Sequence, residues 1–138
     1  MPEESTTPDL VELSRQAFEA VIRRDFSALE GFYAPNAILQ GAEVGTFEGT
    51  AAIRGLFEDM LSPYEEFHGE IEEIIDLGNG VICAVITANG RPVGSSGEVR
   101  LHYATVIMWV EAVIERQTNY VDIHEARAAA ERLAQERG

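Results

Sequence analysis

The chain has 138 residues, and its 10 basic and 24 acidic side chains give a formal net charge of −14 at pH 7. This charge repels phosphate groups, so the composition excludes nucleic acid and anionic membrane surfaces as partners. Every basic residue is Arg. Without Lys, the chain has no Schiff-base nucleophile and no P-loop lysine.

Length and hydropathy predict one folded domain. A chain of this length with 46% hydrophobic residues is able to bury about two-thirds of its unfolded surface. We assign residues 1–8 to a flexible, polar N-terminus and residues 9–138 to a single domain. Cys83 is the only cysteine, no apolar run reaches the roughly 18 residues of a membrane helix, and the first residues lack a secretion signal. We therefore expect a cytoplasmic protein.

Three helices are predicted in the first half of the chain. Thr7 as N-cap and Pro8 at the first helical position indicate a helix start, and apolar residues recur at three- and four-residue steps as far as Ile22. A short helix is expected within 26–32, and a brief extended segment at 37–40. A glycine-rich loop at 41–49 leads to a third helix at 50–61, which Pro63 ends.

Beyond residue 67 the apolar period changes to two, which predicts an antiparallel meander. The expected strands cover 67–77, 81–88, 98–110 and 113–121, with a Gly-Asn-Gly turn at 78–80 and a long loop at 89–97. Asp122 precedes an Ala-rich helix and has Glu125 three positions on, as in a capping box.

The strand at 98–110 is apolar on both faces, so both faces need a cover. Three helices cover one face, which leaves the other for a second subunit. We therefore predict a homodimer through the outer face of the sheet. Its interface residues are expected to be Leu101, Tyr103, Thr105, Ile107 and Trp109.

Three stretches of the chain resemble the nuclear transport factor 2-like superfamily, and specifically its SnoaL-like branch. They are Arg24-Asp25-Phe26-Ser27-Ala28-Leu29 with Phe32-Tyr33-Ala34-Pro35-Asn36-Ala37; Phe47-Glu48-Gly49-Thr50-Ala51-Ala52-Ile53-Arg54; and Val113-Ile114-Glu115-Arg116 with Tyr120-Val121-Asp122. The resemblance implies an α+β cone, in which three N-terminal helices pack on a curved antiparallel sheet and a C-terminal helix follows. The motifs define the fold and leave the reaction open.

The same resemblance implies an apolar pocket, open at one end, that holds a small hydrophobic molecule. Strand alternation aligned to the family places nine strand residues and three helical residues around it, together with Tyr33 as a hydrogen-bond donor. The pocket residues expected on this basis are Phe18, Tyr33, Leu56, Phe57, Ile82, Ala84, Ile86, His102, Ala104, Val106, Gln117, Asn119 and Val121.

The catalytic groups of two known activities of this fold are missing at the aligned positions. The carboxylate base of ketosteroid isomerases falls on Gly41, their tyrosine on Ala17 and their protonated aspartate on Ala104. A carboxylate of limonene epoxide hydrolases falls on Asn119. We therefore reject both specific activities. SnoaL-type cyclases use an acidic residue near the end of the chain, and the corresponding candidate here is Asp122. Helix capping is the favoured interpretation of this residue.

Among the expected pocket residues, His102 is the only one that exchanges a proton near neutral pH. It is the candidate general acid or base of a cofactor-free isomerase, cyclase or dehydratase, with Gln117 and Asn119 holding the substrate. A purely structural role for His102 stays open beside this one. The histidines lie on separate elements, so we predict no metal site and no cofactor.

Two other functions remain open. The near absence of inward carboxylates favours a protein that binds an apolar metabolite without transforming it. A domain that serves only for dimerisation would instead fill its pocket with side chains.

Overall fold

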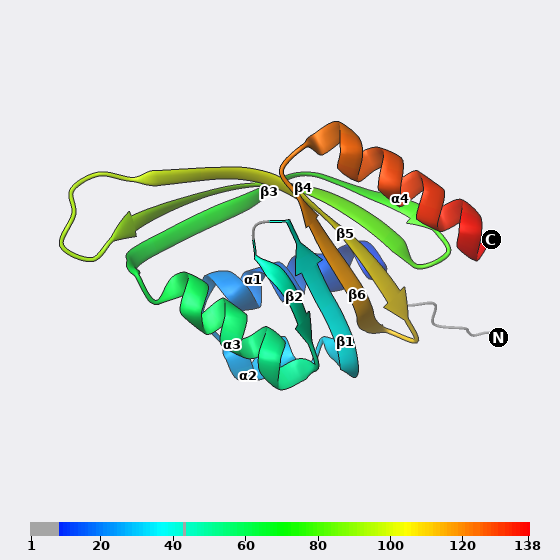
Figure 1. The fold of residues 1–138 in the computed structure, drawn as a ribbon, viewed down its shortest axis with the longest axis horizontal. Coiled ribbons are helices and arrows are strands. Elements are labelled where there is room, and N and C mark those ends of the chain that lie inside the picture. The colour runs from blue at the N-terminus through cyan, green and yellow to red at the C-terminus, as the bar shows by residue number, and fades with distance from the viewer. Residues whose placement is uncertain (1–8, 43) are drawn as a thin grey trace.

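The computed structural model describes residues 9–42 and 44–138, so the predicted flexible segment 1–8 and the predicted Thr7 cap lie outside the described residues. Figure 1 shows a six-stranded sheet with helices on both of its faces, which confirms the predicted α+β cone. The elements are α1 (Leu10–Ile22), α2 (Phe26–Glu30), β1 (Tyr33–Gly41), β2 (Gly45–Glu48), α3 (Thr50–Leu61), β3 (Tyr64–Gly78), β4 (Val81–Pro92), β5 (Val99–Val110), β6 (Val113–Tyr120) and α4 (Ile123–Arg137).

Aspartates cap three of the helices. Asp9 accepts a hydrogen bond from the Glu12 amide at the start of α1, and Asp25 caps α2 in the same way. Asp122 accepts from two amides at the start of α4, which confirms its predicted capping role. These carboxylates satisfy helix N–H groups that would otherwise lack partners. Among the described residues, no helix combines the length and the hydropathy that a membrane crossing needs.

The sheet has the strand order β2-β1-β6-β5-β4-β3. All neighbours are antiparallel except β1 and β6, which pair in parallel. The predicted loop at 41–49 contains β2, which folds back onto a β1 that is longer than expected. Strand β4 likewise continues into the predicted loop at 89–97 as far as Pro92, because its residues up to that point pair with β3.

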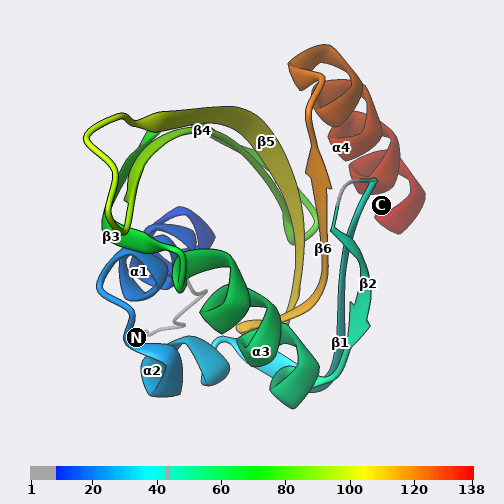
Figure 2. The ribbon, with the colours of Figure 1, turned by 60° about the vertical axis from the view of Figure 1, so that its left-hand side comes forward.

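The sheet curls, and its concave face packs on α1, α2 and α3 (Figure 2). The Trp109 indole at the centre of this core donates a hydrogen bond of 3.1 Å to Ser14 Oγ in α1. Burial of this apolar layer is the main force that holds helices and sheet together. The buried residues are Ala20, Leu29, Tyr33, Ala34, Ala37, Leu39, Ile53, Ile82, Ile107, Trp109 and Ile114.

The convex face has a cover from the same chain. Helix α4 lies across β4 and β5 on the outside of the curl (Figure 2) and buries Ala126, Ala130 and Ala134. Their small side chains let the helix approach the sheet closely. The strand residues beneath are Val81, Cys83, Val85, Ala104 and Val106.

Candidate functional site

The pairing register decides which side chains share the concave face. Ile82 lies opposite Ile107, Ala84 opposite Thr105, and Ile86 opposite Tyr103. Directly opposed residues of an antiparallel pair point to the same side of the sheet. Since Ile82 and Ile107 belong to the helix-covered core, Thr105 and Tyr103 also face the concave side.

The predicted dimer interface is therefore wrong. Its five residues, Leu101, Tyr103, Thr105, Ile107 and Trp109, lie on one face of β5, and that face is the concave one. The apolar character of the other face has a cause within the chain, because α4 covers it. Homodimerisation itself stays a prediction.

A directional chain of hydrogen bonds crosses the concave face. The Tyr33 hydroxyl donates to Gln117 Oε1 at 2.6 Å, and Gln117 Nε2 donates to Thr105 Oγ1 at 3.0 Å. The Thr105 hydroxyl lies 3.5 Å from the Thr118 carbonyl oxygen. Each donor in the chain thus has an acceptor within the protein, and the chain ties β1, β6 and β5 together.

Burial decreases along the concave face from one end to the other. Trp109, Ile107 and Thr105 are at most 5% exposed, whereas Tyr103 and Leu101 are only half-buried. Strand β6 shows the same change, since Ile114 is buried and Gln117 and Asn119 are half-buried. On the β4 side, Ile86 and Ala88, opposite Tyr103 and Leu101, stay buried. We call the region of Leu101, Tyr103 and Asn119 the open end.

Two polar residues characterise the open end. Burial raises the pKa of Tyr103 to about 12, so its hydroxyl is a protonated donor at neutral pH. Burial, and secondarily the charge interaction with Tyr103, also raises the pKa of Tyr33. Asn119 lies opposite Thr105 in the register, and its Oδ1 is sealed from solvent without a hydrogen-bond partner among the described residues.

The predicted inward orientation of His102 is wrong. Alternation along β5 puts it on the same face as Ala104 and Val106, which pack beneath α4. The His102 side chain is 53% exposed, and its Nε2 lies 3.2 Å from Glu72 Oε1. The Thr87 hydroxyl donates to the other oxygen of Glu72.

This convex cluster perturbs one carboxyl group. The hydrogen bond from Thr87 is the largest cause that lowers the pKa of Glu72, and the hydrogen bond and charge of His102 add to it. The Thr87 hydroxyl and the His102 ring contact different oxygens of Glu72 and not each other, so the histidine does not activate the hydroxyl as a nucleophile. The three residues form a polar link across three strands.

The other expected pocket residues divide into two groups. Ile82, Ala84 and Ile86 lie on the concave face with Tyr33, Gln117 and Asn119, and Leu56 and Phe57 pack against the same core. Ala104 and Val106 lie under α4 instead, and Val121 is 65% exposed beyond the end of β6. The predicted inward face of the strand at 98–110 is therefore wrong by one residue: Tyr103 and Thr105 face the concave side, and Ala104 and Val106 do not.

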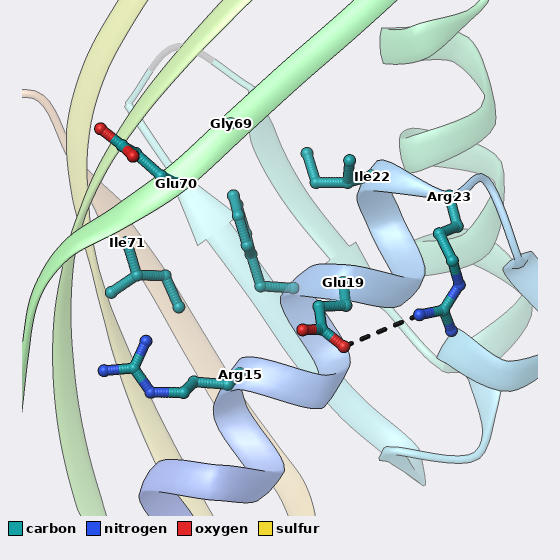
Figure 3. Close-up of a pocket in the computed structure, with 8 residues that line it drawn as sticks. Arg15, Glu19, Ile22, Arg23, Gly69, Glu70 and Ile71 are labelled. Atoms are coloured by element: carbon teal, nitrogen blue, oxygen red, sulfur yellow. Dashed lines mark ion pairs between the residues drawn. The ribbon is translucent and has the colours of Figure 1, made fainter.

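Phe18 lies in a groove of about 450 Å³ between α1 and β3. In Figure 3, Ile71 points toward α1 and Glu70 points away from it, while an ion pair of 3.7 Å joins Arg23 to Glu19 at the rim. Gly69 allows the close approach, because a Cβ atom there would lie 2.9 Å from the Phe18 ring. Two of its residues are in register with the open end, because Ile71 pairs with Ile86 opposite Tyr103, and Gly69 pairs with Ala88 opposite Leu101.

Sequence reasoning missed Tyr103 and Thr105 as concave-face residues. Both faces of β5 are apolar near Trp109, so the pattern there does not fix the phase. The start of the strand indicates the orientation. Arg100 and His102 point to one face, and Leu101 and Tyr103 point to the other. Charged and polar residues on one phase indicate the side that faces water.

This geometry defines an α+β cone whose concave face is partly open and carries uncharged side chains on β4, β5 and β6. The sequence profile described as the SnoaL-like domain matches residues 14–116, and the chain belongs to this family. The predicted resemblance is thereby confirmed. A comparison with curated protein sequences finds no match.

Solved structures share the fold at low sequence identity. A putative SnoaL-like polyketide cyclase from Shewanella putrefaciens CN-32 aligns with a TM-score of 0.72 at 12% identity, covering 93% of this chain and 99% of that one. A hypothetical protein with a ketosteroid isomerase-like fold from Catenulispora acidiphila DSM 44928, in complex with trimethylamine, gives 0.70 at 19%, covering 91% and 94%. An epoxide hydrolase of M. tuberculosis, described as LEH-like, gives 0.69 at 13%, covering 88% of each chain.

Proposed function

We propose that the protein binds a small, neutral, largely apolar molecule at the open end without transforming it. One observation carries this proposal: the side chains assigned to the concave face of β4, β5 and β6 are apolar or uncharged. They are Ile82, Ala84, Ile86, Leu101, Tyr103, Thr105, Ile107, Trp109, Ile114, Gln117 and Asn119. Burying an unpaired charge among them would be costly, whereas an apolar molecule gains by leaving water.

The same set of residues argues against proton-transfer chemistry. Tyr33 and Tyr103 have raised pKa values and remain protonated, so they donate hydrogen bonds and do not act as bases. His102, the candidate acid or base, lies on the convex face. Ala104, aligned with the isomerase aspartate, faces α4, and its inward neighbours Tyr103 and Thr105 are not carboxylic acids.

A fluorescence titration with the neutral probe N-phenyl-1-naphthylamine tests the proposal. We expect saturable binding with a blue-shifted emission, which Leu101→Trp reduces because the larger ring narrows the open end. Arg100→Trp is the matched control, since Arg100 is exposed and adjacent in sequence on the opposite face. The proposal fails if the wild-type protein does not bind the probe, or if both variants weaken binding equally while circular dichroism shows both folded.

The predicted alternative of a pure dimerisation domain needs a free sheet face and a pocket filled with side chains. Helix α4 covers the apolar centre of the convex face, and the alternative stays a prediction. The expected cytoplasmic location stays a prediction.

A further inference from the structure

The hydrogen-bond chain on the concave face leaves few polar groups for a ligand. Tyr33, Gln117 and Thr105 direct their donors to one another or to the Thr118 carbonyl. Redirecting any of these donors to a ligand would break a partly buried hydrogen bond and gain little net free energy. The polar groups that distinguish ligands must therefore be others.

Tyr103 supplies the first of these groups. No hydrogen bond joins its hydroxyl to another described residue, and the hydroxyl oxygen is not among the atoms sealed from solvent. Burial nevertheless keeps the phenol protonated, with a pKa of about 12. A protonated hydroxyl that is recessed, accessible and without an internal acceptor is suited to donate to a ligand oxygen.

Asn119 supplies the second group. Its Oδ1 is sealed and without a partner, whereas its Nδ2 is not among the described atoms that are both sealed and unpartnered, and no hydrogen bond joins it to another described residue. A buried oxygen without a partner is tolerated more readily than a buried N–H without one, so the orientation with nitrogen toward the opening is the favoured one. Asn119 opposes Thr105, and Tyr103 is two residues further along the same face, a diagonal separation of roughly 7–8 Å.

Both accessible groups at the open end are thus donors, and the described concave-face residues of β4, β5 and β6 include neither a carboxylate nor a cation. We propose that Tyr103 and Asn119 are specificity-determining residues that select neutral carbonyl compounds over hydrocarbons of the same shape. The carbonyl oxygen accepts from the Tyr103 hydroxyl, from the Asn119 amide, or from both. This inference rests on the proposed binding function.

The test compares 1-tetralone with tetralin, which has the same carbon skeleton without the oxygen. Isothermal titration calorimetry would measure both ligands on the wild type, Tyr103→Phe and Asn119→Ala. We expect Tyr103→Phe to weaken 1-tetralone binding about fivefold, as the loss of one neutral hydrogen bond requires, while tetralin binding changes by less than about twofold. Asn119→Ala should act in the same direction.

Tyr120→Phe is the matched control, because Tyr120 opposes Ala104 on the convex face and packs with the cluster beneath α4. It should leave the ratio of the two affinities unchanged. A second readout is the ¹³C shift of carbonyl-labelled 1-tetralone, which we expect to move downfield on binding the wild type and less on binding Tyr103→Phe.

The outcomes separate the two proposals. Equal weakening of both ligands by Tyr103→Phe, or a bound carbonyl shift that this variant does not alter, overturns the donor assignment and leaves the binding function standing. Failure of the wild type to bind either ligand or the fluorescent probe overturns both. Retained binding of tetralin with selective loss of 1-tetralone supports the donor assignment even where a variant is less stable.

Discussion

The hydrogen bond between Tyr33 and Gln117 spans 2.6 Å between side chains that are 84 residues apart in the chain. It joins β1 to β6, the one parallel pair in the sheet. Gln117 in turn donates a hydrogen bond to Thr105 of β5. A bond in this position fixes the strands that carry Asn119 and Tyr103, so its first consequence concerns stability.

Tyr33→Phe should lower the free energy of unfolding by about 1–2 kcal/mol, because Gln117 Oε1 loses its donor in a partly buried site. Urea denaturation followed by circular dichroism measures the change. Tyr64→Phe is the control: the Tyr64 ring packs on Phe67 at 5.4 Å and is half-buried, and its hydroxyl has no hydrogen bond among the described residues. We expect a change within about 0.5 kcal/mol there. Equal losses would contradict the role of the bond.

The link of Thr87, Glu72 and His102 predicts a pH dependence with a defined sign. The pKa of Glu72 is lowered in the folded protein, first by the Thr87 hydroxyl and then by His102. Its contribution to stability is therefore present above the ordinary carboxyl value of 4.5 and is lost as the pH falls through the lowered pKa.

Thr87→Val removes the hydroxyl and should raise the Glu72 pKa toward its ordinary value, whereas Thr87→Ser should keep it low. Carboxyl ¹³C NMR over an acid titration reports the pKa directly. If Glu72 titrates identically in the Val variant and the wild type, the Thr87 hydroxyl is not the main cause of the shift.

Particular residues show how far the sequence alone predicts this structure. The motifs around Tyr33, the 50–61 helix and the Asp122 cap predicted the fold, because caps, helical periods and turns are local signals. The site depends on the register between β4 and β5, which is set by tertiary pairing. A register shift of one residue places His102 on the concave face instead of Tyr103. The packing of α4 on the sheet also joins residues that are far apart in the chain, so local sequence patterns do not reveal it.

The turn between β3 and β4 offers a comparison of two glycines. Gly78 and Gly80 have φ values of +87° and +82°. A Cβ atom at Gly80 would lie 2.4 Å from the Trp109 carbonyl oxygen, whereas one at Gly78 would meet nothing within 4 Å. Both positions carry the strain of a positive φ in any L-residue, but only Gly80 adds a backbone clash.

Gly78→Ala should therefore cost about 1 kcal/mol, from the backbone conformation alone. Gly80→Ala should cost about 2–4 kcal/mol, because the clash also disturbs the hydrogen bond from the Trp109 amide to the Gly80 carbonyl. Thermal and urea unfolding of the two variants measure the difference. A Gly80→Ala variant as stable as Gly78→Ala would show that the turn shifts without cost.

The packing of α4 on the convex face is tested at Ala130, which is fully buried against the apolar strand residues beneath the helix. Ala130→Glu places a carboxylate there without a partner, so we expect a loss of about 3 kcal/mol or release of α4 from the sheet. Release would uncover Val81, Val85 and Val106. Exposed apolar surface of this kind promotes self-association, which size-exclusion chromatography with light scattering detects.

Ala128→Glu is the control on the exposed side of the same helix, where a change within about 0.5 kcal/mol is expected. Identical stability and identical mass for the two variants would mean that α4 does not cover the sheet in solution, and the convex face would again need a partner.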